Sequence, residues 1–162
     1  MSLWCLVTAP LILSGDIARL DDFTLGLLTN DEVIEVDQDP LGQAARRVAK
    51  DGDLEIWAKD MEDGRKAVGL FNLDETQAVV TVKWSDLGIR GNQVIRDLWR
   101  QEDIGTFNGQ FAAPVGEYGV VLVSLRPVGR QHLQSRGRST SPRRPSTAPP
   151  SRINSNSCTV KL

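Results

Sequence analysis

The sequence predicts a mainly β fold: an antiparallel β-sandwich that follows one strand and the flanking helices of an α/β barrel and precedes a disordered basic tail. Three observations carry this prediction. Apolar residues recur at helical spacing over residues 17–45 and with a period of two from about residue 47. Turn signals containing Gly separate the period-two runs. The last residues are mostly Ser, Arg and Pro. We therefore expect three parts, at residues 1–45, 46–128 and 129–162.

The first sixteen residues, MSLWCLVTAPLILSGD, allow two interpretations. A signal peptide has a basic start, an apolar stretch and a small-x-small cleavage site, but here Arg19 is the first basic residue and Pro10 interrupts the apolar run. In the other interpretation, residues 1–8 end a helix, residues 11–13 form a buried strand and residues 14–16 form the following turn. An α/β barrel repeats the order helix, apolar strand, polar loop and helix. A single unit of this kind does not form a closed barrel.

Two short helices are predicted before the sandwich. Asp21 or Asp22 is placed to cap a helix whose apolar residues include Phe23 and Leu27. Asn30 is placed to cap a second helix with two acidic residues in its first turn. Pro40 and Gly42 then interrupt the chain at QDPLG.

About six short strands are predicted from residue 47 on. Apolar residues alternate over residues 54–58 and 78–84, and the second run places Trp84 on the core face of a strand. Residues 67–73 and 119–125 are continuously apolar, as in strands covered on both faces. Turn signals stand at residues 51–52, 63–64, 90–92 and 108–109. This pattern predicts an antiparallel sandwich of about 80 residues.

Charge divides the chain. Residues 129–162 carry six Arg and one Lys without Asp or Glu, a charge of +7, so residues 1–128 carry −9 of the total of −2. The tail has too few large apolar residues to fold, and we expect it to be disordered. Such a tail attracts anionic partners electrostatically or is a solvated appendage; we expect no specific nucleic-acid binding. No run reaches the roughly 18 apolar residues of a membrane span.

Cofactor and metal sites are not predicted. The two Cys lie at opposite ends of the chain and the single His, His132, lies in the tail, so we expect no disulfide framework, His-based triad or zinc site. The localisation stays open on this composition.

Several segments, taken together, resemble the C-terminal region of family 27 glycoside hydrolases, the α-galactosidases and α-N-acetylgalactosaminidases. They are APLILSGDIARL, LLTNDEVIEVDQDPLGQ, WAKDMEDGRKAVGLFNLDE, VKWSDLGI, RDLWRQEDIG and GEYGVVLVSL, in collinear order over residues 3–127. The chain departs from the family pattern mildly, at Val36, Asp37 and Tyr118. The resemblance implies that residues 3–45 are the last unit of a (β/α)8 barrel and residues 46–128 the whole sandwich.

The resemblance also implies a retaining glycosidase that acts on terminal α-galactosides. In the family the two catalytic Asp precede the region matched here, so no residue of this chain takes either role and we expect the chain alone to be inactive. A partner is then expected to cover the apolar residues between 3 and 28, and removal of residues 1–45 is expected to leave a soluble sandwich. The alternative is a carbohydrate- or protein-binding sandwich, with or without a cleaved signal peptide.

Four residues are candidates for a substrate site. Ser14 and Asp16 follow the predicted barrel strand, at the end of a barrel that carries active sites, although Asp16 equally suits a helix cap. Trp57 and Trp99 are candidates for stacking on a sugar ring, although aromatic residues in strand runs mostly pack in a core.

Asp37 and Asp39 form a carboxylate pair beside Pro40. Such a pair suits acid–base chemistry, but next to a Pro-Gly break we expect the two side chains to accept backbone N–H bonds where the two predicted domains join.

Overall fold

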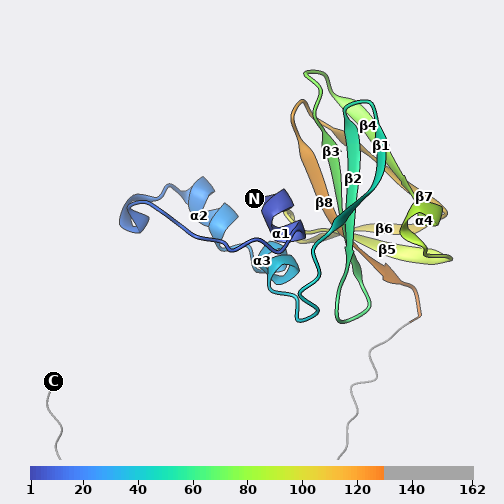
Figure 1. Ribbon diagram of the computed structural model, residues 1–162, viewed down its shortest axis with the longest axis horizontal. Helices are drawn as coiled ribbons and strands as arrows, with labels where there is room; N and C mark the ends of the chain where they lie inside the picture. The colour runs from blue at the N-terminus through green and yellow to red at the C-terminus, as the bar shows by residue number, and fades with distance from the viewer. Residues whose placement is uncertain (130–162) are drawn as a thin grey trace, which may run out of the picture. The chain divides into compact units, whose positions relative to one another are not determined.

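A computed structural model describes residues 1–129, and the predicted tail beyond Gly129 lies outside the described residues. The N-terminal part holds α1 (Ser2–Leu6), the 3-10 helix η1 (Ile17–Arg19), α2 (Asp22–Leu28) and α3 (Asp31–Asp37). The rest holds β1 (Arg46–Asp51), β2 (Leu54–Asp60), β3 (Lys66–Asn72), β4 (Ala78–Lys83), α4 (Trp84–Leu87), β5 (Asn92–Asp97), β6 (Glu102–Asn108), β7 (Gln110–Val115) and β8 (Val120–Pro127) (Figure 1).

The strands form two antiparallel sheets, which confirms the predicted sandwich. One sheet has the order β1-β2-β3-β8-β5-β6, and β4 pairs with β7 in the other. The turn signals predicted at residues 51–52, 63–64 and 108–109 each connect two consecutive strands, β1 to β2, β2 to β3 and β6 to β7. β1 begins at Arg46, where the sandwich was predicted to begin, but the described residues on both sides of this point belong to one compact unit.

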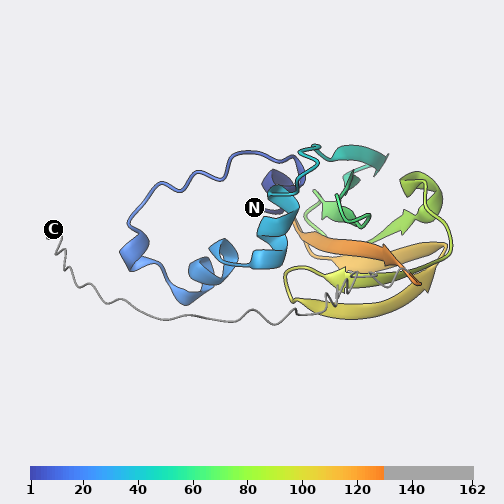
Figure 2. The same ribbon diagram turned by 90° about the horizontal axis from the view of Figure 1, so that it is seen from below.

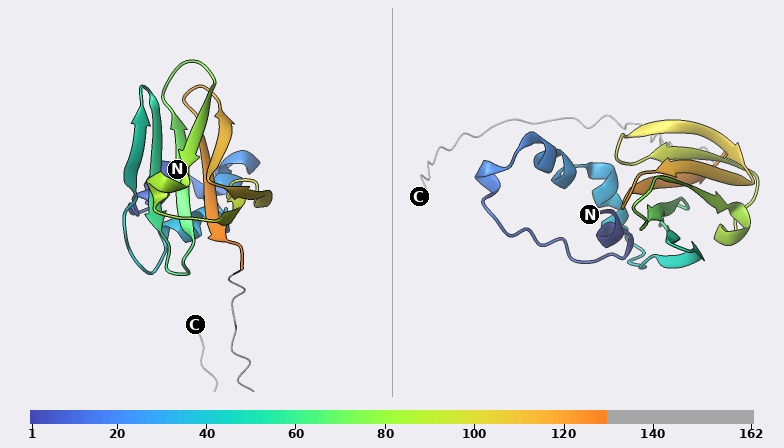
Figure 3. Two further views of the ribbon diagram at one scale, coloured as in Figure 1. Left: turned by 90° about the vertical axis from the view of Figure 1, so that its right-hand side faces the viewer. Right: turned by 90° about the horizontal axis from the view of Figure 1, so that it is seen from above.

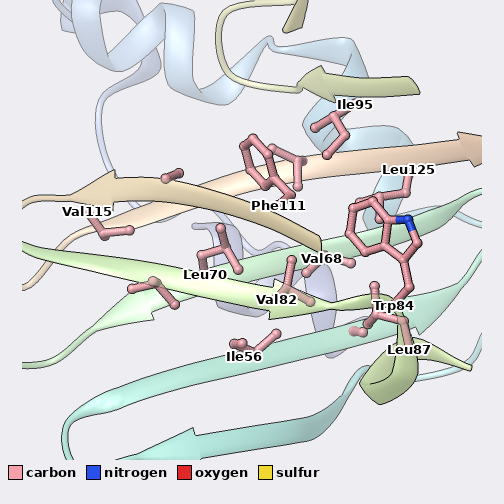
Figure 4. Close-up of a cluster of buried hydrophobic side chains, with 14 residues drawn as sticks. Ile56, Val68, Leu70, Val82, Trp84, Leu87, Ile95, Phe111, Val115 and Leu125 are labelled. Carbon is pink, nitrogen blue, oxygen red and sulfur yellow. The ribbon is translucent and has the colours of Figure 1, made fainter. Parts of the chain in front are cut away.

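The main core lies between the sheets (Figure 4). Val82 of β4 and Phe111 of β7 point toward Leu70 of β3 and Leu125 of β8. Trp84 also lies in this core, 3% exposed, and donates its indole N–H to the Gly91 carbonyl at 3.0 Å. The prediction that Trp84 continues a strand is wrong: the chain turns into α4 at this residue.

A second core covers the outer face of the six-stranded sheet, and we call it the outer cluster. Its buried members come from α1, α3, the sheet and the segments between strands: Cys5, Leu6, Val33, Val36, Ala45, Met61, Ala67, Leu98 and Leu122. Both faces of β3 and β8 are therefore buried, as their continuous apolar runs predicted. The helices before residue 46 thus share a core with the sheet.

Helix caps form as predicted. The Asp21 carboxylate accepts from the Thr24 N–H at 2.6 Å at the start of α2, and Asn30 Oδ1 accepts from the Val33 N–H at 3.1 Å at the start of α3. Residues 11–13 form neither helix nor strand, so the predicted strand is not formed in this chain. Ile12 is 82% exposed, which agrees with the expectation that the apolar residues between 3 and 28 are left uncovered.

Candidate functional site

Residues 8–29, which we call the arm, leave the sandwich after α1 and return to it at α3. The chain runs from α1 out to η1 and back through α2, as Figure 2 and the right-hand view of Figure 3 show from opposite sides. No side chain of α2 is buried, and Phe23 within it is 76% exposed. Leu13 and Leu25 are also exposed, as is Trp4 on the neighbouring α1. The arm therefore presents apolar side chains to solvent, and monomeric domains rarely expose contiguous apolar patches.

Ser14 and Asp16 both lie in the arm and are exposed. The Asp16 carboxylate accepts the Ala18 N–H at 3.1 Å and so caps η1. Capping uses only one lone pair of this carboxylate, so the structure is compatible with a second contact. A role of Ser14 and Asp16 at the rim of a substrate pocket stays a prediction.

Trp57 and Trp99, the two predicted stacking residues, are half-buried against the outer cluster. The Trp57 indole N–H donates to Glu55 Oε2 at 3.0 Å, and the Trp99 indole N–H donates to Ser2 Oγ at 2.9 Å. The Trp99 bond therefore joins α1 to the segment after β5, whereas the Trp57 bond lies within β2. Trp99 lies in the turn between β5 and β6, so its predicted position in a strand run is wrong.

The carboxylate that accepts the Trp57 indole N–H, Glu55, also contacts two basic side chains. Arg47 and Lys50 of β1 contact Glu55 at 2.8 and 3.0 Å. The Trp57 hydrogen bond first, then Lys50 and Arg47, hold the pKa of Glu55 below its ordinary value. Glu55 is therefore a stabilising carboxylate with all its partners in the sheet.

Polar contacts hold α3 on the sheet. The Glu32 carboxylate accepts from Arg96 of β5 at 2.6 Å, and this bond raises the pKa of Arg96 above its usual value. Glu35 accepts from Arg65 at 2.7 Å. The Asn30 amide donates to the Leu98 carbonyl at 3.1 Å. Anchored at both ends, α3 has a fixed position, in contrast to α2.

Lys59 of β2 lies under the end of α3, and its side chain is buried, 4% exposed. Its Nζ donates to the Val36 carbonyl at 2.6 Å and to Thr8 Oγ1 at 3.0 Å. Burial lowers the pKa of Lys59, opposed by the nearby Asp39 and Asp37 carboxylates. The sequence pattern did not indicate this role of Lys59, because the alternation in β2 places the residue on the face away from the main core.

The two carboxylates behave differently. Asp39 accepts the backbone N–H of Leu41 at 3.1 Å and that of Glu62 at 2.9 Å, which confirms its predicted place in a turn that joins the N-terminal part to the sandwich. Asp37 accepts from the Gln38 side chain instead, and its buried Oδ1 has no hydrogen-bond partner among the described residues. Burial, together with Asp37, raises the pKa of the Cys5 thiol beside them, which favours its protonated form.

Neither a metal site nor a membrane span is found in the part of the chain that the structure describes. Over residues 1–129, His, Cys, Asp and Glu side chains do not gather in threes as metal ligands would. The helices within the same range are too short and insufficiently apolar to cross a bilayer.

Comparison with known proteins gives a family match. Residues 51–125 match the "Alpha galactosidase C-terminal beta sandwich domain". The alpha-galactosidase of Coffea arabica is 39% identical over 128 residues, which are 78% of this chain and 34% of that protein. The alpha-galactosidase of Cyamopsis tetragonoloba is 37% identical over 128 residues, 78% of this chain and 31% of that protein. The chain spans about a third of the length of the curated relatives it matches.

Solved structures agree. A GH27 β-L-arabinopyranosidase from Geobacillus stearothermophilus superposes with a TM-score of 0.76 at 36% identity, over 82% of this chain and 30% of that one. Alpha-galactosidase I from Mortierella vinacea superposes with a TM-score of 0.75 at 27% identity, over 78% of this chain and 34% of that one. In each comparison the sandwich is a small part of a larger protein.

Proposed function

The chain belongs, through its C-terminal β-sandwich, to family 27 of the glycoside hydrolases, and we propose that it is the non-catalytic part of an α-galactosidase-type enzyme. In this proposal a (β/α)8 barrel carries out retaining hydrolysis of terminal α-galactosides, and the sandwich supports that barrel through α1, α3 and the arm. The catalytic carboxylates would come from the barrel, and this chain alone would not turn over substrate.

The observation that carries the proposal is the contrast between α3 and the arm. Ion pairs and a buried lysine fix α3 to the sheet. The arm between α1 and α3 exposes Ile12, Leu13 and Phe23. An apolar surface held on a fixed base suits docking against another folded unit, because little conformational entropy is lost when it binds.

The names of the relatives favour a structural role for the sandwich over a role in selecting the sugar. A similar sandwich occurs in proteins named alpha-galactosidase and in one named β-L-arabinopyranosidase. This chain is 39% identical to the first and 36% identical to the second, so one kind of sandwich accompanies enzymes that are named for different sugars. We therefore assign substrate recognition to the barrel, with at most rim contacts from Ser14 and Asp16.

A chimera tests the proposal. Residues 1–128 of this chain would replace the matched C-terminal region of the Coffea arabica alpha-galactosidase, and hydrolysis of a chromogenic α-galactoside would be measured. We expect turnover by the chimera and none by this chain alone or by the Coffea arabica protein without its C-terminal region. Robust turnover by the chain alone would contradict the proposal.

Matched variants of the chimera test the arm. Phe23→Asp puts a charge on the arm, and Val79→Asp puts one on β4 of the sandwich, where Val79 is 63% exposed. We expect Phe23→Asp to abolish soluble active chimera, because the charge would be buried without a partner. Val79→Asp should leave activity within about twofold, as surface substitutions usually do. Equal effects of the two variants would show that the arm does not dock.

A further inference from the structure

Thr8 has a strained backbone at the point where the arm leaves α1. Its φ is +55°, in the left-handed region that β-branched residues strongly disfavour. Thr8 follows Val7, the C-cap of α1, and its N–H donates to the Cys5 carbonyl at 3.3 Å. Strain of this kind persists only where surrounding contacts hold the residue, and it marks positions with a conformational role.

Lys59 supplies the holding contact. The Thr8 hydroxyl accepts from Lys59 Nζ at 3.0 Å and donates to the Gln43 carbonyl at 3.2 Å. The same Nζ donates to the Val36 carbonyl at 2.6 Å. That carbonyl lies in the last turn of α3, where carbonyl groups lack helical partners and a cation is favoured. One buried ammonium group therefore ties β2, the end of α3 and the start of the arm together.

We propose that Lys59 and Thr8 form a latch that sets the direction in which residues 9–16 leave the sandwich. The latch makes both residues positioning residues for the loop that carries Ser14 and Asp16. This last consequence rests on the proposed function, in which that loop lies at the rim of a substrate pocket. The latch itself is independent of the proposed function.

The charges around Lys59 explain why a buried lysine is kept there. Asp37, the last residue of α3, and Asp39, just beyond the helix, lie near the ammonium group, and Cys5 of α1 is the third titratable neighbour. A buried cation is tolerated only with such compensation. A neutral side chain of equal length would fill the same volume, but it would neither hold the Val36 carbonyl nor donate to Thr8.

Hydrogen exchange of the full chain tests the latch. The Ala9 N–H, which donates to the Trp4 carbonyl at 3.0 Å, reports on the start of the arm. We expect Lys59→Met and Thr8→Ala each to raise its exchange at least tenfold, while amides of β3 and β8 exchange as before. Lys59→Arg keeps a cation and should restore most of the protection. Lys50→Met is the matched control: Lys50 lies on the adjacent strand, is half-exposed and pairs with Glu55, so the Ala9 amide should not respond.

The double variant decides between a latch and two separate effects. If Lys59 and Thr8 act through one contact, Lys59→Met in the Thr8→Ala background adds little further exchange. Full additivity, or unchanged exchange in Thr8→Ala, would overturn the proposal. Thr8 is half-buried and Thr8→Ala removes only its hydroxyl and methyl groups, so this variant gives the answer even where Lys59→Met does not fold.

Kinetics of the chimera test the consequence for the pocket. Thr8→Ala in the chimera should raise KM for the α-galactoside about tenfold and change kcat less than twofold, because rim residues bind substrate and do not react. An unchanged KM would overturn the role as positioning residues. An inactive chimera would count against the proposed function alone, since exchange in the isolated chain decides the latch separately.

Discussion

Replacing Gly69 with Ala tests how closely α1 packs against the sheet. Gly69 lies in β3 beside Trp57 of β2, and its φ lies outside the left-handed region, so Ala adopts the same backbone conformation. An added Cβ would lie 2.6 Å from Leu6 Cδ1 and 2.6 Å from Phe71 Cε2. Carbon atoms in contact are about 3.5–4.0 Å apart, so both neighbours must move by about 1 Å.

The two neighbours differ in how freely they move. The Phe71 ring is half-buried, whereas Leu6 is fully buried within the outer cluster, so its side chain gives way less easily. Overpacking of this kind costs about 1–3 kcal/mol, and replacing a strand Gly by Ala returns about 0.5–1 kcal/mol. We therefore expect a net loss of about 1–2 kcal/mol, felt mainly in the docking of α1 rather than between the two sheets.

Hydrogen exchange locates this loss. The Ala45 N–H donates to the Leu6 carbonyl at 2.8 Å and reports on α1 docking. A loss of 1–2 kcal/mol corresponds to exchange roughly 5–30 times faster at this amide, with β5 and β8 unchanged. Gly116→Ala is the matched control, because a Cβ at Gly116 meets no atom within 4 Å.

A double-mutant cycle with Leu6→Ala provides the refutation. Truncating Leu6 removes the clash with Leu6 and leaves the one with the half-buried Phe71 ring, so Gly69→Ala should cost less in the Leu6→Ala background than in the wild type. If Gly69→Ala leaves exchange at Ala45 unchanged, or if its cost is the same in both backgrounds, α1 does not approach β3 as closely as the contacts indicate.

Three further predictions concern the sheet and its outer face. Because its pKa is lowered on folding, the Glu55 carboxylate stabilises the fold above its ordinary pKa of 4.5 and loses this effect as the pH falls below it. Glu55→Gln should therefore cost about 1–2 kcal/mol in urea unfolding at pH 7, and the difference between the two proteins should shrink as the pH is lowered below 4.5. Deleting residues 1–45 uncovers the outer cluster, so we now expect lower stability and aggregation by light scattering rather than a more soluble sandwich. Both indoles are engaged within the fold, so neither Trp57→Phe nor Trp99→Phe should change the result of a calorimetric titration with galactose. Binding of galactose that is lost in either variant would restore the stacking hypothesis.

Local features of the fold were predictable because their causes lie within a few residues. Asp21 and Asn30 cap the helices that follow them, since a side-chain oxygen at that position reaches the N–H three residues on. Strand alternation over residues 78–83 identified the core face of β4 for the same reason. The start of α4 at Trp84 was missed, although Gly88, left-handed at φ +66°, gives the C-cap signal that ends this helix.

Features that depend on distant segments were not predictable in the same way. Alternation in β2 separates Ile56 from Lys59 but does not say what covers the outer face. Helices α1 and α3 cover it. Lys59 is held there by contacts with Thr8 and Val36, which lie 51 and 23 positions earlier in the chain. The continuous apolar run at residues 67–73 did indicate that something covers that face. The apolar residues 11–13 were predicted as a buried strand, but a strand requires a neighbour, and the described part of the chain provides none for them.

The buried Lys59 and the exposed arm are connected through Thr8, the first residue of the arm. The sandwich places a charged group, Lys59, inside a core, and the arm places apolar groups such as Ile12 and Phe23 in solvent. Each placement is unfavourable by itself. Together they are consistent with a domain whose polar contacts fix the starting point of the arm, so that its apolar surface is held ready before a partner binds. Such pre-organisation lowers the entropic cost of association, and it predicts that weakening the latch weakens docking of the arm even though Lys59 does not lie on the docking surface.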